Sequence, residues 1–317
     1  MQIPVQDRAR VTLRNDLSRS LFWGIVEAGY HSVALLVAIR YFQASDGAKS
    51  LIACGASIGF LLAPLFLLVI SRSGMTASRA CALCMAGAAL GTLSAAMTHQ
   101  VWVYTLGFMF SLILVAQVPS LMVHVYSRNY PPGERGKRLS GNLMIAAGTG
   151  AVASLLIGRA LDHDLSLYHQ ILWGIFIACI LAAVLHLRIP SEPLRTKTQP
   201  GFLHDLKLAL QDRFFAWMLF AWMLMGVGNL LTIPLRVEYV ANPKYGINAS
   251  NTAVLAITVI IPAISRVISA PVWAFFFDRV NLGLVRISIN ICFFGGIFLY
   301  FYSQTLAWLG ISAAIIG

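Results

Sequence analysis

Nine long apolar stretches constrain the fold of this chain more than any other feature. About twenty apolar residues in a helix are enough to cross a bilayer. A tenth stretch begins near Leu306 and reaches Gly317. A helix that ends in mid-membrane leaves backbone polar groups without partners, so we expect an all-α membrane protein that is a fragment of a longer chain. The nine complete stretches lie at roughly 20–40, 50–70, 80–98, 101–126, 139–160, 168–188, 214–236, 252–277 and 284–303.

The composition is also typical of a membrane protein. The chain is 58% hydrophobic and 11% charged, whereas an average soluble domain is roughly 25% charged. The five cysteines lie in apolar stretches, so we expect no disulfide framework. The sequence has no phosphate-binding loop, nucleophile triad or zinc cluster. It therefore predicts no metal or cofactor, and it argues against an ATP-driven pump or a membrane hydrolase.

The positive charges predict the orientation in the membrane. With the N-terminus in the cytoplasm, seventeen of the 23 Lys and Arg fall in the tail and the cytoplasmic loops, and five fall on the other side. An excess of Lys and Arg marks the cytoplasmic side. We therefore expect a cytoplasmic N-terminus and a location in the cell (inner or plasma) membrane. The same asymmetry explains the net charge of +11, so it implies no nucleic-acid partner.

Two segments 207 residues apart indicate an internal repeat. Segment 63–79 reads APLFLLVISRSGMTASR, and segment 270–286 reads APVWAFFFDRVNLGLVR. Both end an apolar stretch, with one proline and two arginines in matching positions. One basic connection with several prolines separates six apolar stretches from the restart of the pattern. We expect an N-terminal six-helix bundle at 1–188, a cytoplasmic linker at 189–212 and an incomplete C-terminal bundle at 213–317.

These repeated segments resemble the loops of a known membrane-protein family. Asp278 and Arg279, followed by Arg286, resemble the D-R-x-G-R loop that the major facilitator superfamily carries between helices eight and nine. The copy between helices two and three keeps Arg72 but has Ser71 in place of the acid. The chain is identified as a member of this superfamily. The resemblance implies an MFS-type 6+6 transmembrane helix bundle, with nine complete helices and part of the tenth present.

The same resemblance implies secondary active transport by alternating access. In that mechanism two bundles rock about a substrate site near the membrane midplane. Charged loop residues can then pair with the neighbouring bundle in one state and separate in the other. For Arg72 and Arg79, anchoring by the positive-inside rule remains an alternative. The candidate gating residues are Asp278, Arg279, Arg286, Arg72 and Arg79.

Polar residues at membrane depth are the candidates for the substrate and proton site. Glu27 lies about 9 Å into the first apolar stretch, and Arg266 lies about 18 Å from the nearest loop. His31 follows Glu27 by four residues, so both lie on one helix face, with Tyr30 beside them. In the family, helices one, four and seven line the central cavity, and helix eight borders it. The candidates are Glu27, His31, Arg266, Gln117, Asn229 and Tyr30.

We expect Glu27 to gain and lose a proton during transport. Arg266 would hold an anionic group of the substrate, or pair with Glu27 when the site is empty. A structural pair with a neighbouring helix is the alternative role for either residue. Because their charges cancel, the sequence does not predict the charge of the substrate.

Three classes of function compete at this stage. The first is transport of a small organic solute by a monomer in the lipid bilayer, with a proton as the candidate coupling ion; the coupling ion and the direction of transport stay open. The second is a non-transporting sensor or assembly factor with the same fold. The third, a membrane enzyme that uses His31 or His124, lacks an acid at fixed spacing. Solute flux in proteoliposomes separates the first two.

Overall fold

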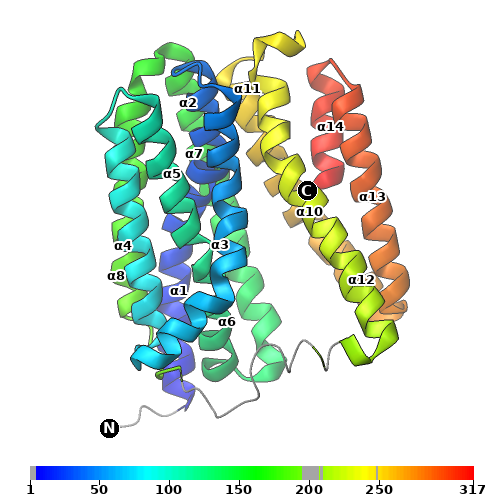
Figure 1. Cartoon of the computed structure of the whole chain (residues 1–317). Coiled ribbons are helices and arrows are strands. Elements are labelled where there is room, and N and C mark those ends of the chain that lie inside the picture. The colour runs from blue at the N-terminus through cyan, green and yellow to red at the C-terminus, as the bar shows by residue number, and fades with distance from the viewer. Residues whose placement is uncertain (1–4, 195–206, 208–209, 248) are drawn as a thin grey trace.

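The computed structural model describes residues 5–194, 207, 210–247 and 249–317 (Figure 1). It contains nine helices in these ranges that are long and apolar enough to cross a membrane, which confirms the prediction from the apolar stretches. The sequence FLHDLKLALQD at 202–212 favours a short amphipathic helix on the cytoplasmic surface, and this segment lies mostly outside the described residues. The side chains of Val5, Gln6, Ala274, Phe277, Asp278 and Leu282 also lie outside the description.

Most of the nine spans are single helices, and three are divided. The first span joins α1 (Val5–Ala28) to α2 (Ala34–Arg40) through a π-helical turn, Gly29–Val33. The fourth joins α5 (Val101–Val115) to α6 (Gln117–Asn129), and the eighth joins α11 (Asn251–Leu255) to α12 (Ile261–Arg279) through a second π-helical turn, Ala256–Ile260. The others are α3 (Asp46–Ser73), α4 (Ala77–Ala96), α7 (Arg135–His163), α8 (Tyr168–Leu187), α10 (Arg213–Ala241) and α13 (Leu282–Tyr302), and the shorter α14 (Leu306–Ile316) follows them.

Local capping signals set the turn between α3 and α4. Gly74 follows α3 with φ 69°, a left-handed conformation that glycine adopts without steric penalty. The side chain of Thr76 then accepts a hydrogen bond from the backbone N–H of Arg79 and caps the start of α4. The turn is therefore short, and it places Arg72 and Arg79 at the same end of the molecule.

The first helix begins about fifteen residues earlier in the sequence than the apolar stretch predicts. The expectation was a start near residue 20, whereas α1 begins at Val5. The residues between them are polar, but Asp16 and Arg19 are buried against neighbouring helices. Hydropathy does not detect such a segment, because its polar groups are satisfied inside the bundle.

The spans lie in two groups (Figure 1). The N-terminal bundle comprises the spans up to Leu187, and the C-terminal bundle comprises α10 to α14. In the N-terminal bundle α1 packs on α7 and α8, α3 packs on α5, and α4 packs on α5 and α8. We call the end at which α1 begins and α8 ends the linker end, and the opposite end, at which α2 and α10 finish, the far end.

Small residues allow α3 to lie close against α5. A Cβ atom added to Gly59 would come within 2.6 Å of the Ala116 side chain and 2.7 Å of the Ile113 carbonyl oxygen. Gly55, one turn earlier, is similarly close to Leu112 and Met109. This G-x3-G face packs helices as small-residue motifs do in membranes.

Candidate functional site

Helix α1 exposes a narrow polar face. Val26, Ala28 and Tyr30 are buried, whereas Glu27 and His31 are exposed. Glu27 and His31 are four residues apart, so they lie on one side of the helix, as expected from their spacing. The other faces of this span are covered by α7, α8 and the rest of the N-terminal bundle.

The exposed face near His31 is directed toward the C-terminal bundle. The π-helical turn Gly29–Val33, which contains His31, contacts α10. A small pocket of about 30 Å³ lies there, and both His31 and Pro234 of α10 line it. Its volume is about that of one water molecule, so the two bundles are almost in contact at this level.

The π-helical turn is itself a feature of functional helices. An inserted residue in an α-helix rotates the following side chains and is found often at functional sites. In α1 the turn falls between Glu27 and the end of the span. Within the turn, Tyr30 is buried and His31 is exposed.

Tyr30 and Gln117 lie inside the N-terminal bundle. The Tyr30 hydroxyl lies 2.6 Å from the Thr92 hydroxyl and 3.3 Å from the Cys179 sulfur. Gln117 donates its amide N–H groups to the carbonyl oxygens of Gly59 and Ile113, at 2.7 and 2.9 Å. The structure therefore does not bring these two polar groups together with Glu27.

Two candidates of the C-terminal bundle are exposed. Asn229 lies on α10, and Arg266 lies on α12. Neither the Arg266 guanidinium nor the Glu27 carboxylate forms an ion pair with another described residue, so the expected pair between them is not made in this state.

Arg236 is a third polar residue of the C-terminal bundle, after Asn229 and Arg266. It is one of the five Lys and Arg that the sequence places on the non-cytoplasmic side, and it is not among the predicted site residues. Its Nε and Nη1 atoms are buried without a hydrogen-bond partner among the described residues. It lies on α10 near Tyr300, whose hydroxyl donates to the Arg236 carbonyl oxygen at 3.1 Å. A cation five residues from the end of a span was the signal that could have found it.

The candidate gating arginines of the second loop make aromatic contacts within the C-terminal bundle. The Arg279 guanidinium lies 3.9 Å from the centre of the Phe275 ring. Arg286 lies 4.9 Å from the centre of the Trp222 ring and so joins α13 to α10. The side chain of Asp278 lies outside the described residues, and Arg72 and Arg79 are exposed on the N-terminal bundle.

Polar contacts join the two bundles at the far end. The Lys49 ammonium of α3 lies 2.8 Å from the Glu238 carboxylate of α10, and both residues are buried. Arg40, at the end of α2, donates to the carbonyl oxygen of Ala249 at 2.7 Å. The partners in each contact are about 190 residues or more apart in sequence. Glu238 is the single acid within α10, and it is the one sequence signal that could have suggested such a contact.

Asp162 adds a third contact at the same end. The sequence around it, Asp162 to Asp164, favours a polar cap between the fifth and sixth spans, and Asp164 does accept the backbone N–H of Ser166 there, at 2.8 Å. The Asp162 carboxylate accepts the backbone N–H groups of Asn251 and Thr252 of the C-terminal bundle, at 2.6 and 3.0 Å, and thereby caps the start of α11. Gly158 of α7 lies against the Thr252 backbone beneath it.

Every hydrogen bond and ion pair between described residues of the two bundles lies at the far end. Toward the linker end, α10 and α12 diverge from the N-terminal bundle (Figure 1). The two bundles are therefore held together at one end and separate toward the other.

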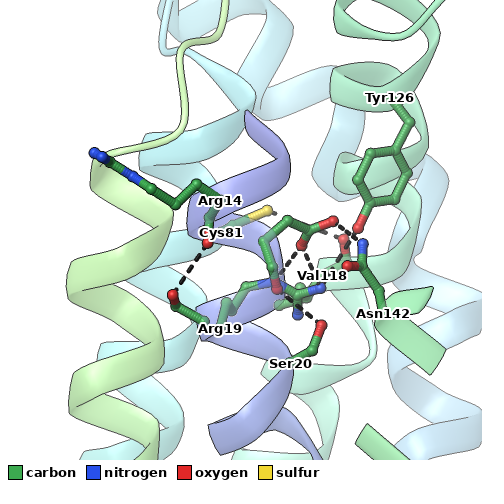
Figure 2. Close-up of polar contacts among 9 residues, drawn as sticks. Arg14, Arg19, Ser20, Cys81, Val118, Tyr126 and Asn142 are labelled. Carbon is green, nitrogen blue, oxygen red and sulfur yellow. Dashed lines mark hydrogen bonds and ion pairs between the residues drawn. The ribbon is translucent and has the colours of Figure 1, made fainter. Parts of the chain in front are cut away.

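A second charged cluster lies inside the N-terminal bundle at the linker end (Figure 2). The Asp16 carboxylate accepts from Arg19 Nε at 2.8 Å, and the Asn142 amide also donates to it. Arg19 reaches the Tyr126 hydroxyl at 3.4 Å. The cluster joins α1 to α6 and α7. Among the described residues, no group of three His, Cys, Asp or Glu is placed to hold a metal ion.

Comparison with known structures supports the same architecture. The nucleoside transporter NupG superposes with a TM-score of 0.69 at 15% identity, over 98% of this chain and 78% of NupG. A peptide transporter, POT, in complex with alafosfalin gives 0.65 at 13% identity, over 99% and 82%. A bacterial homologue of the human lysosomal transporter Spinster gives 0.62 at 17% identity, over 100% and 73%. No curated protein matches the sequence.

The family comparison agrees with the fold. The family model described as Major Facilitator Superfamily matches residues 17–317. The family and the similar structures indicate a multi-pass membrane transporter of a small molecule rather than an enzyme. Since the match covers nearly the whole chain, the chain belongs to the Major Facilitator Superfamily.

Proposed function

We propose that this protein is a secondary active transporter of a small organic solute that works by alternating access. The observation that carries the proposal is that Glu27 and His31 are exposed on a largely buried span, between two bundles whose described polar contacts with each other lie at the far end. A charged face at membrane depth is unfavourable in lipid, so it requires an aqueous path or a ligand.

We propose that the linker end is cytoplasmic and that the protein lies in the cell membrane. The excess of Lys and Arg in the tail and in alternate loops supports this orientation. In that orientation the structure corresponds to a state that is closed outside and open toward the cytoplasm. The contacts of Lys49 with Glu238, Arg40 with Ala249 and Asp162 with α11 then form the closed outer side.

The polar residues of the proposed site come from both bundles. Glu27 and His31 belong to the N-terminal bundle, and Asn229 and Arg266 belong to the C-terminal bundle. An anionic group of the substrate would be held by Arg266, and a proton would be carried by Glu27. When the outer side opens, the two walls rotate relative to each other, and the site becomes accessible from the other side.

Proton movement in proteoliposomes tests this proposal. The full-length protein is reconstituted with a pH-sensitive dye inside, and nucleosides, dipeptides and small carboxylic acids are added in turn. We expect at least one solute to cause internal acidification in the wild type. Glu27→Gln removes the titratable group and is expected to abolish the dye response.

Glu134→Gln is the matched control, because Glu134 is an exposed acid that pairs with Arg138 at 2.5 Å, away from the site. It is expected to behave as the wild type. Wild-type coupling in Glu27→Gln would remove Glu27 from the mechanism. Solute binding without flux for every solute would favour the sensor or assembly factor instead.

A further inference from the structure

A groove of about 620 Å³ lies on the outer surface of the N-terminal bundle, between the α3–α4 turn, α4 and α8. Ala82 and Ala183 form part of its floor and are nearly buried, whereas Leu83 and Leu187 stand at its sides and are each 59% exposed. Helices α4 and α8 lie on the side of this bundle that is away from the C-terminal bundle (Figure 1). The groove is therefore separate from the proposed substrate site and faces the surrounding membrane.

The groove runs from the linker end into the membrane. Its lining on α4 extends from Arg79 to Ala86, and its lining on α8 extends from Leu187 back to Ile180. Seven residues of helix correspond to about 10 Å along the axis, or about a third of the hydrocarbon thickness. Its depth fits the upper part of an acyl chain in one leaflet.

The polar end of the groove is cationic. Arg79 lines it in the first turn of α4, is exposed, and forms no side-chain hydrogen bond or ion pair with a described residue. Arg72 and Arg188 are exposed and adjoin the lining residues Ser73 and Leu187 in sequence. No acidic residue lines the groove, so its charge is complementary to an anion.

The closest acid in sequence to Arg188 is engaged elsewhere. Glu192 accepts from Arg8 at 2.7 Å. The segment beside it runs along the start of α4, where Ser191 accepts from the backbone N–H of Ser78. The described part of the linker, up to Leu194, therefore covers the start of α4 but leaves the Arg79 side chain accessible.

We propose that this groove binds an anionic phospholipid, with the phosphate at Arg79 and an acyl chain between α4 and α8. Such a lipid would use both parts of the site, the cationic end at Arg79 for its phosphate and the apolar groove for its acyl chain. Guanidinium groups bind phosphate oxygens through paired hydrogen bonds, and basic residues at the membrane surface attract anionic lipids. A soluble phosphate would use the arginine without the apolar groove. A zwitterionic lipid would also present a phosphate to Arg79, but its ammonium group would be repelled by the neighbouring arginines.

Lipid retention measured by native mass spectrometry tests the proposal. The full-length protein in detergent is mixed with phosphatidylglycerol, phosphatidylcholine or inorganic phosphate. We expect the wild type to retain phosphatidylglycerol at least about fivefold more than phosphatidylcholine. Arg79→Gln removes the cation and should abolish that preference. Ala86→Leu fills the floor of the groove and should reduce retention of both lipids.

Arg128→Gln is the matched control, because Arg128 is an exposed arginine at the same end, on α6. It should retain phosphatidylglycerol as the wild type does, whereas an equal loss would mean that only the surface charge matters and would overturn the proposal. Equal retention of the two lipids by the wild type would also overturn it. So would full retention in Arg79→Gln, or displacement of the lipid by inorganic phosphate alone.

Discussion

Asp16 and Glu27 lie on the same helix, α1, in opposite environments. Asp16 is buried and accepts from both Arg19 and Asn142. Glu27 is exposed and has no ion-pair partner among the described residues. A paired buried carboxylate fixes helices together, whereas an unpaired carboxylate beside an opening is available to a proton or a ligand. The contrast assigns a structural role to the first and the proposed transport role to the second.

The largest expected effect is on stability at Asp16. Asp16→Ala leaves the Arg19 charge buried without its partner, so we expect a loss of about 3 kcal/mol in the free energy of unfolding. Glu27→Gln is expected to change it by less than about 0.5 kcal/mol. Thermal unfolding in one detergent measures both. Equal losses of unfolding free energy in Asp16→Ala and Glu27→Gln would contradict the assignment of different roles to the two acids.

Smaller effects on stability are expected in the π-helical turn, where the buried Tyr30 and the exposed His31 are neighbours. Tyr30→Phe removes a buried hydroxyl from its contact with Thr92, so we expect a loss of about 1 kcal/mol in stability and no change in substrate affinity. His31→Asn is expected to leave stability within about 0.5 kcal/mol and to weaken substrate binding. Unfolding curves and binding titrations on both variants check this. Weakened binding in Tyr30→Phe alone would reverse the assignment.

The apolar stretches predicted the helices well, because crossing a membrane imposes both length and hydropathy. The loop motif around Arg72, and its second copy around Arg279, also predicted the family, since the residues within each copy are close together in sequence. The start of α1 was wrong by about fifteen residues. Asp16 and Arg19 in this segment are buried against protein, and a hydropathy average does not distinguish such residues from ones that face water.

Side-chain direction and long-range pairing were the parts that the sequence did not predict. Tyr30 and Gln117 lie in the first and fourth spans, as expected, but a position along a span does not say toward which neighbour a side chain turns. The π-helical turn also changes the rotation at Tyr30. The Lys49–Glu238 pair joins residues in different bundles, and nothing local to either residue specifies its partner.

A reversible cross-link across the far end tests alternating access most directly. Lys49→Cys and Glu238→Cys are introduced after replacement of the five native cysteines and are joined in proteoliposomes by a short bis(methanethiosulfonate) reagent, which forms a reducible disulfide with each cysteine and releases methanesulfinate. We predict that solute-driven acidification stops on cross-linking and returns on reduction, with either single cysteine variant unaffected by the reagent. Transport at the same rate with the far end cross-linked would contradict the account.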